Sequence, residues 1–398
     1  MHTLPYWRLS GYYFFYFAFI GAFSPYFGLY LQSLSFSAWD IGLLMSQMQL
    51  MRLSAPFICG VLADRMAQRI VVVRLAALLS LLGFLAFFTV RSFEAMLIAM
   101  ALLAFFWSAA LPLVETVTFD HLREDPARYS RIRLWGSIGF IVAVMGTGAV
   151  LDSLPLPSLL WVIVGTLIGI LIYALAVPEA PSQHLAREHL PVATILRQTR
   201  VRALFAACFA MSAAHGALYV FYSIHLADHH YSTFLVGSLW SLGVLTEIVV
   251  FFFMGGLLSR FGLRAILLVS FAAAVVRFLM IGWGVAWLSV IVLAQLLHGL
   301  TFGAYHAAAI AAINRWFPGR SQARGQALYS SVSFGAGGLV GSLLSGWTWE
   351  RWGAGPTYAL SSAFALVGLL FVARWVKRTD LDEVSEKEPL RVADGSHP

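Results

Sequence analysis

The sequence predicts an all-α membrane protein whose twelve transmembrane helices form two pseudo-symmetric six-helix bundles, and three observations support this fold class. The chain has 398 residues, of which 60% are hydrophobic and only 11% are charged. Soluble domains average about 25% charged residues. The apolar residues also form long runs, with arginines gathered between them. We therefore expect a lipid bilayer to surround most of the chain.

Twelve apolar runs are long enough to cross a membrane. A spanning helix needs about 20 mainly apolar residues, because lipid offers no partner for unpaired backbone groups. The predicted spans are residues 8–32, 39–62, 70–90, 94–120, 131–152, 157–177, 201–227, 233–257, 264–284, 286–314, 324–348 and 356–376. An even number of spans places both termini on the same side of the membrane.

The basic residues predict which side that is. Of the 26 lysines and arginines, all but Arg52, Arg91, Arg277 and Arg351 lie in or beside segments on the side of the termini. Loops rich in arginine and lysine stay in the cytoplasm, so both termini are expected to be cytoplasmic. We interpret the net charge of +7 as a signal of topology and expect no nucleic-acid partner.

The chain divides into two halves. Residues 178–200 form the longest polar interruption, and we expect a cytoplasmic middle loop there. The interruption separates an N-terminal bundle (1–177) from a C-terminal bundle (201–376), which is followed by a cytoplasmic tail (377–398) expected to be disordered. An internal repeat supports this division, because the segment 60–69 aligns without gaps with the segment 255–264.

This repeated segment resembles the signature loop of the major facilitator superfamily. It reads Gly60-Val-Leu-Ala-Asp64-Arg65-Met-Ala-Gln-Arg69, and its copy ends in Ser259-Arg260-Phe-Gly262-Leu-Arg264. We expect Gly60 to permit close helix approach, and the charged residues to bridge neighbouring helix ends and hold one gate conformation. The resemblance implies secondary transport by alternating access around a site at mid-membrane. The predicted gate residues are Gly60, Asp64, Arg65, Arg69, Arg260 and Arg264.

Ionisable residues within the spans are candidate functional residues, because a charge in lipid is costly. Glu115 and Arg133 lie in one half, and Glu247, Arg277 and His298 in the other. We expect two acid–arginine pairs, Glu115 with Arg133 and Glu247 with Arg277. That these pairs only hold helices together is the alternative.

The same residues carry a closer resemblance. Glu115 and Arg133 stand at the spacing of the sugar-binding pair of the lactose permease. Arg277 and His298 resemble its coupling arginine and histidine, and Glu247 resembles its helix 8 glutamate. Other segments are more similar to the phenylpropionate-transporter family. These segments are Leu111-Pro112-Leu113, Arg133-Leu-Trp135-Gly136-Ser137, Trp240-Ser-Leu-Gly243-Val-Leu-Thr-Glu247 and Leu297-His298-Gly-Leu-Thr-Phe302.

Two departures from the permease bear on substrate and coupling. Thr301 stands where the permease has its proton-carrying glutamate, and Phe140 stands where a tryptophan stacks on the sugar. We therefore assign the proton to Glu247, which would move in and out of reach of Arg277, with His298 sharing or relaying the proton.

A further arginine, Arg52, is predicted to lie near mid-membrane without an acidic partner in its half. We expect it to bind a substrate carboxylate, with Gln49 beside it on the same helical face. Binding to backbone carbonyls or pairing with another acid is the alternative. Aromatic residues such as Tyr26, together with Phe140, would suit a flat aromatic substrate if they face inward.

The predicted function is a proton-coupled symporter that imports a small organic solute, an aromatic carboxylate of phenylpropionate type. A galactoside or nucleoside proton symporter, or a drug exporter of the same fold, remains an alternative. No nucleophile–base–acid set is visible, so we expect no enzyme activity. We expect no metal and no cofactor beyond the proton gradient, and a monomer in a bacterial inner membrane. Its expected partners are the solute, protons and lipid.

Overall fold

The computed structural model describes residues 4–66, 68–122, 128–180, 192–318 and 321–377, with only the backbone described at Asp64 and Ala323. These residues form helices and no strand. Six spans make up the N-terminal half: α1 (Tyr6–Ser33), α2 (Ala38–Met66), α3 (Arg69–Leu85) with η1 (Ala86–Phe88), α4 (Phe93–Leu122), α5 (Arg128–Ser153) and α6 (Ser158–Ala176). Each one matches a predicted span to within a few residues.

The C-terminal half is less regular. It contains α7 (Val192–Leu196), α8 (Thr199–Ala214), α9 (Gly216–Asp228), α10 (Thr233–Gly284), α11 (Leu288–Leu296), η2 (Gly299–Ala304), α12 (Tyr305–Trp316), α13 (Gln322–Ser330), η4 (Ser331–Gly337), α14 (Gly338–Trp352) and α15 (Ala354–Trp375). The short helix α7 occupies part of the predicted middle loop. Residues 181–191 of that loop and residues 378–398 of the predicted tail lie outside the described residues.

Within the described chain, ten helices are long and apolar enough to cross a membrane. Two reasons reconcile this number with twelve spans. The helix α10 contains two predicted spans, which meet at Gly262, where a φ of 74° breaks the helical path. The helix α2 is not among the ten, because it carries Asp40, Arg52 and several other polar residues. One of these polar residues, Gln49, lies against Gly338 of α14 in the other bundle rather than against lipid.

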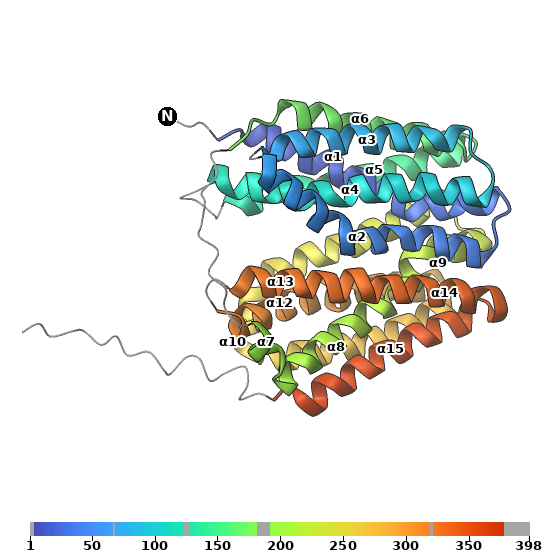
Figure 1. Cartoon of the computed structure of the whole chain (residues 1–398). Helices are drawn as coiled ribbons and strands as arrows, with labels where there is room; N and C mark the ends of the chain where they lie inside the picture. The colour runs from blue at the N-terminus through green and yellow to red at the C-terminus, as the bar shows by residue number, and fades with distance from the viewer. Residues whose placement is uncertain (1–3, 67, 123–127, 181–191, 319–320, 378–398) are drawn as a thin grey trace, which may run out of the picture.

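The two halves form two bundles that lie side by side (Figure 1). In the N-terminal bundle α1 packs against α5 and α6, and α4 packs against α2 and α3. In the C-terminal bundle α10 packs against α15, α11 and η2, and α15 packs against α8. The bundles meet through α2 with α14 and through α5 with α10, so a site between them draws on both halves of the chain.

The bundles are in close contact at one end. Tyr26 Oη donates to the carbonyl oxygens of Val144 (2.8 Å) and Thr233 (3.1 Å), and the second bond crosses between the halves. A Cβ added at Gly42 of α2 would lie 2.8 Å from the Cα of Gly346 in α14. Only glycine permits this approach, so this end is closed by backbone-to-backbone packing.

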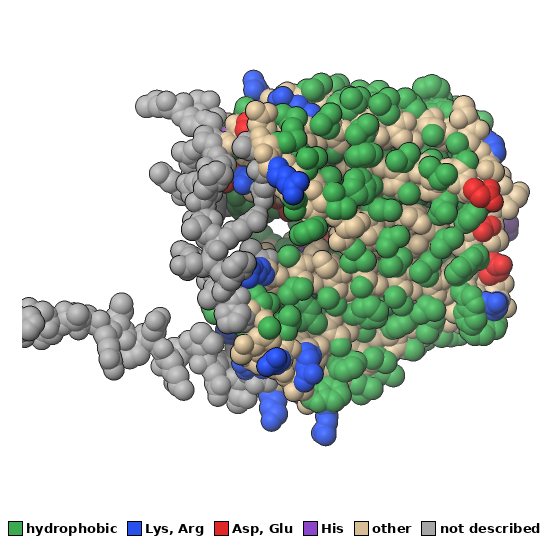
Figure 2. All heavy atoms as spheres, viewed as in Figure 1, with side chains coloured by type: hydrophobic (Ala, Val, Ile, Leu, Met, Phe, Trp, Pro, Cys, Tyr) green, Lys and Arg blue, Asp and Glu red, His purple; other side chains and the backbone are tan. Residues whose placement is uncertain are grey.

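The opposite end is open. This end, which we call the arginine-rich end, carries Arg65, Arg69, Arg260 and Arg264. A Cβ added there at Gly60 would meet nothing within 4 Å. Figure 2 shows a gap between the two bundles at this end, beside the basic side chains. The structure is therefore open at one end only, and the central space is reached from the arginine-rich end.

Candidate functional site

A cavity of about 320 Å³ lies between the bundles and is lined by both of them. Its volume is in the range of small-molecule sites, which are mostly apolar with a few polar groups. Most of its wall is aromatic or aliphatic, and the polar side chains that matter below are Gln49, Arg52 and Arg133 from the N-terminal half and His215, Glu247 and His298 from the C-terminal half.

Among the described residues, Arg52 forms one side-chain hydrogen bond. Its Nη1 donates to Gln49 Oε1 at 3.2 Å, and its guanidinium carbon lies 5.8 Å from the ring centre of Trp107. A guanidinium has five N–H donors. Among the described residues no carboxylate lies within ion-pair distance of Arg52. The predicted placement of Gln49 beside Arg52 is confirmed, and both side chains line the cavity.

Arg133 also lines the cavity, but the predicted ion pair with Glu115 is not formed. The guanidinium carbon of Arg133 lies 3.8 Å from the ring centre of Phe17 on α1. Glu115 instead accepts a hydrogen bond from Tyr129 Oη at 3.2 Å and is not part of the cavity wall. The pairing prediction was wrong because spacing along the chain does not fix where a side chain turns.

Phe140 and Tyr26 have different positions. Phe140 of α5 lines the cavity as predicted. Tyr26 does not, because its hydroxyl is bound to two backbone carbonyls at the closed end. Of the six residues predicted to bind substrate, the structure therefore brings Gln49, Arg52, Arg133 and Phe140 together around one space, and places Tyr26 and Glu115 elsewhere.

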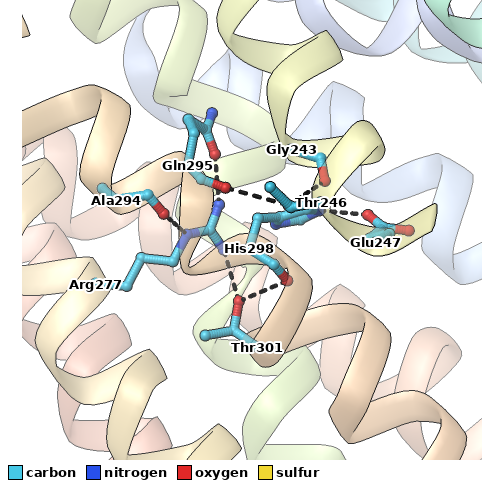
Figure 3. Close-up of polar contacts among 8 residues, drawn as sticks. All are labelled: Gly243, Thr246, Glu247, Arg277, Ala294, Gln295, His298 and Thr301. Atoms are coloured by element: carbon cyan, nitrogen blue, oxygen red, sulfur yellow. Dashed lines mark hydrogen bonds and ion pairs between the residues drawn. The ribbon is translucent and has the colours of Figure 1, made fainter. Parts of the chain in front are cut away.

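In the C-terminal wall Glu247 is paired with His298. His298 Nε2 lies 2.6 Å from Glu247 Oε1, and both side chains face the cavity (Figure 3). Gly243, one turn before Glu247 on α10, allows the imidazole to lie against this helix, since an added Cβ would be 3.1 Å from His298 Cδ2. The two residues share one strong hydrogen bond that a proton can occupy from either side.

Arg277 lies behind this pair and does not contact Glu247, contrary to the predicted pairing. Its side chain is fully buried and donates to the carbonyl oxygen of Ala294 (2.9 Å), Thr301 Oγ1 (3.0 Å) and Gln295 Oε1 (2.8 Å) (Figure 3). Each of the three guanidinium nitrogens thus has a neutral acceptor, and none of them bonds the carboxylate of Glu247. Thr301 holds Arg277 directly, which the sequence did not reveal.

The repeated gate segments tie helices together within each bundle. Arg69 forms an ion pair with Asp120 of α4. Arg264 donates to the carbonyl oxygens of Val376 (2.7 Å) and Ala373 (3.1 Å), at and just beyond the end of α15. The expected close helix approach at Gly60 is absent because this end of the molecule is open.

The other gate residues make fewer contacts. Arg65 is exposed, and the guanidinium carbon of Arg260 lies 5.3 Å from the ring centre of the neighbouring Phe261. The side chain of Asp64 lies outside the described residues. In this conformation the contacts of the described gate arginines thus lie within each half and do not join the two halves.

Several cavity residues were not among the predicted site residues. Trp107, Tyr219 and Trp240 line the wall, and Trp240 Nε1 donates to Ser223 Oγ at 3.1 Å. His215 is buried in the same wall. The available signal for His215 was an ionisable side chain within a predicted span, the criterion that selected His298.

A family model described as the MFS_1 like family matches residues 6–360. The chain belongs to this family. Over 362 residues it is 29% identical to a protein of Escherichia coli (strain K12) described as a probable 3-phenylpropionic acid transporter, covering 89% of this chain and 94% of that protein. It is 27% identical to the maltose permease of Geobacillus stearothermophilus, over 92% of this chain and 93% of the permease.

Solved structures show the same fold. The crystal structure of the nucleoside transporter NupG superposes with a TM-score of 0.81 at 17% identity, covering 92% of this chain and 98% of the transporter. These findings confirm the resemblance and the fold class predicted from the sequence. This family member is a multi-pass membrane transporter of small solutes with the major facilitator fold, and not an enzyme.

Proposed function

We propose that this transporter is a proton-coupled symporter that imports an aromatic carboxylate of phenylpropionate type by alternating access. The observation that carries the proposal is the pair of guanidiniums of Arg52 and Arg133, which face an aromatic cavity without a carboxylate partner among the described residues. Both arginines are half-buried in the open cavity. A substrate carboxylate would supply the anion that their guanidiniums lack among the described residues when the bundles close around them.

The aromatic wall of the cavity favours an aryl group as the remaining part of the substrate. Rings from both halves face the cavity, so a flat apolar group can be enclosed between them once the bundles close. The ring-bearing lining residues are Phe17, Phe19, Phe23, Trp107, Phe140, Tyr219, Trp240, Phe302, Tyr305 and Phe334. Such a surface favours an aryl group over a polyhydroxylated sugar, whose hydroxyls would lose water without gaining partners. The similarity to the protein described as a probable 3-phenylpropionic acid transporter agrees with this choice.

The position of the Glu247–His298 pair supports proton coupling. The pair faces the same cavity as Arg52 and Arg133, from the opposite bundle. One carboxylate entering with one proton adds no net charge to the cavity. The carboxylate would lie against the arginines and the proton on the Glu247–His298 pair, so fewer charges lack an opposite partner when the cavity closes.

The arginine distribution supports the orientation. With the arginine-rich end in the cytoplasm, both termini are cytoplasmic and the open cavity faces inward. Each chain has its own complete cavity between two bundles, so a monomer in a bacterial inner membrane suffices for the cycle.

A binding screen on the purified protein tests the substrate class. We expect 3-phenylpropionate to bind, and 3-phenylpropanol, which has the same ring but no charge, to bind about 10-fold or more weakly, because it lacks the charge-assisted hydrogen bonds. A nucleoside and a galactoside are the competing ligands. Binding of either one, without binding of any aromatic acid, would overturn the proposed substrate and support the corresponding alternative.

A further inference from the structure

His215 lies at the junction of α8 and α9, within one continuous span, and it lines the cavity together with Tyr219. Its Nδ1 is 2.8 Å from the carbonyl oxygen of Met211. A carbonyl can only accept, so Nδ1 carries the hydrogen and Nε2 of the neutral ring presents a lone pair. This Nε2 is buried and has no hydrogen-bond partner among the described residues.

The neighbouring imidazole, that of His298, also has a ring nitrogen without a hydrogen-bond partner among the described atoms. His298 uses Nε2 to contact Glu247, and its Nδ1 is buried without a partner among the described atoms. The centres of the two rings are 6.3 Å apart with an angle of 64° between the ring planes. Two unsatisfied nitrogens on adjacent buried rings are unusual, because each costs free energy unless some state of the protein pairs it.

The hydrogen on His298 Nδ1 depends on whether the Glu247–His298 pair holds the transferable proton. With that proton, either Glu247 donates to Nε2 or His298 is an imidazolium, and in both cases Nδ1 carries a hydrogen. Without it, the charged Glu247 accepts from Nε2–H, and Nδ1 is a lone pair. His215 Nε2 is therefore a suitable acceptor for His298 only in the proton-loaded state.

We propose that His215 is a further positioning residue of the proton site, accepting the Nδ1–H of His298 when the pair is loaded and facing it lone pair to lone pair when the pair is empty. This inference rests on the proposed function, since it concerns the proton that drives transport. It makes the contact between two helices depend on proton occupancy.

The backbone hydrogen bonds continue through His215, whose N–H donates to Met211 and whose carbonyl accepts from Tyr219. His298, by contrast, directly precedes η2, a π-helical segment. Such segments break the regular backbone ladder and are frequent at functional sites. In this conformation the ring centres, 6.3 Å apart, are too distant for a direct nitrogen–nitrogen hydrogen bond, so the proposed contact requires the two spans to approach each other. Proton loading would thus draw the two spans together.

The other ionisable groups around the pair of histidines are compatible with this role. Arg277 acts electrostatically on both histidines, and its N–H groups are held by Ala294, Gln295 and Thr301. Arg133 acts on Glu247 from the opposite bundle.

The remaining neighbours of His215 are mostly aromatic. Tyr219, Phe278 and Phe302 surround its ring, and of these only Tyr219 is ionisable. His298 is then the one neighbour among the described residues whose donor pattern changes with the transferable proton.

The test is a pH titration of the purified full-length protein without substrate, followed by the infrared band of the protonated Glu247 carboxyl. The band is assigned by its loss in Glu247→Gln. We expect His215→Phe, which removes the acceptor, to lower the midpoint of the band by about half to one pH unit. The midpoint falls because the lost hydrogen bond stabilises only the protonated state.

Matched variants isolate the cause. His215→Gln keeps an acceptor at the ε position and should titrate close to wild type, whereas the shorter His215→Asn should resemble His215→Phe. His306→Phe makes the same exchange at a half-buried histidine that bonds Tyr329 rather than Glu247, and it should leave the midpoint unchanged. In a His298→Gln background, His215→Phe should produce no further shift.

The outcomes separate this inference from the proposed function. If no pH-dependent carboxyl band is lost in Glu247→Gln, the proposed proton site fails, and the role of His215 fails with it. An unchanged midpoint in folded His215→Phe overturns the role of His215 alone. If His215→Phe does not fold, equal midpoints for His215→Gln and His215→Asn overturn it instead.

Discussion

At the scale of single residues, three arginines within the spans differ in what their guanidiniums contact. All three guanidinium nitrogens of Arg277 donate within its own bundle, to Ala294, Gln295 and Thr301. Arg52 has one bond to Gln49, and Arg133 lies over Phe17. Only Arg52 and Arg133 face the cavity, so we assign substrate recognition to these two and a structural role to Arg277.

Replacing Arg52 should weaken binding of the acid without unfolding the protein. We expect Arg52→Ala to lower the affinity for 3-phenylpropionate about 10- to 100-fold, because a charge-assisted hydrogen bond is lost. Arg52→Lys should lose part of this, since an ammonium cannot bind a carboxylate with two parallel bonds.

The measurement is calorimetric or fluorescence binding on purified variants. Arg91→Ala is the matched control, because Arg91 binds only backbone carbonyls near one end of the bundle, those of Phe87, Phe88 and Val90. Wild-type affinity in both Arg52 variants would exclude a role for Arg52 in binding the carboxylate and leave it a packing residue.

At the scale of the helices, close glycine contacts decide which end of the molecule is shut. Gly42 and Gly346 bring α2 and α14 together at the closed end, and Gly148 brings α5 against Thr233 at the start of α10. The open end has no such contact at Gly60, Gly255 or Gly256. The closed state of one end thus depends on small residues that larger side chains would disrupt.

We expect Gly42→Val to open that end. The new side chain would meet the backbone of Gly346 and Ser342, and overpacking of this kind costs about 1–3 kcal/mol, a change of about fivefold or more in the balance between closed and open. The measurement is the rate at which a membrane-impermeant thiol reagent, added from the arginine-poor side, labels a Val244→Cys variant in the cavity wall. Cys59 and Cys208 are first replaced by serine.

Gly146→Val is the control for this experiment, because a Cβ at Gly146 on α5 meets nothing within 4 Å. It should label at the parent rate. Equal labelling rates for Gly42→Val and Gly146→Val would show that the glycine contact does not hold the end closed.

The sequence predicted the helices well because length and hydropathy govern them, but it could not predict their irregularities. The break at Gly262 and the π-helical segments η2 and η4 depend on packing between spans.

Side-chain partners were predicted less well, because they too depend on packing between spans. Spacing brought Glu115 near Arg133, yet Glu115 turns to Tyr129. Gln49 and Arg52 were predicted correctly because they are neighbours on a single helix.

At the scale of the whole molecule, two bundles meet at one end and separate at the other, with the cavity between them. The N-terminal half contributes the guanidiniums of Arg52 and Arg133, and the C-terminal half contributes the Glu247–His298 pair. The groups proposed to bind substrate and proton thus face each other across the surface along which the bundles would rock. In this account neither half can complete the cycle without the other.

The most direct test of this account is uptake of 3-phenylpropionate into proteoliposomes with an imposed proton gradient. The wild-type protein should accumulate the acid against its gradient, and a protonophore should abolish the accumulation. Glu247→Gln should exchange labelled for unlabelled acid but accumulate none, because it cannot release a proton. Uphill uptake by Glu247→Gln at the wild-type level, or wild-type accumulation that persists with the protonophore, would contradict the account.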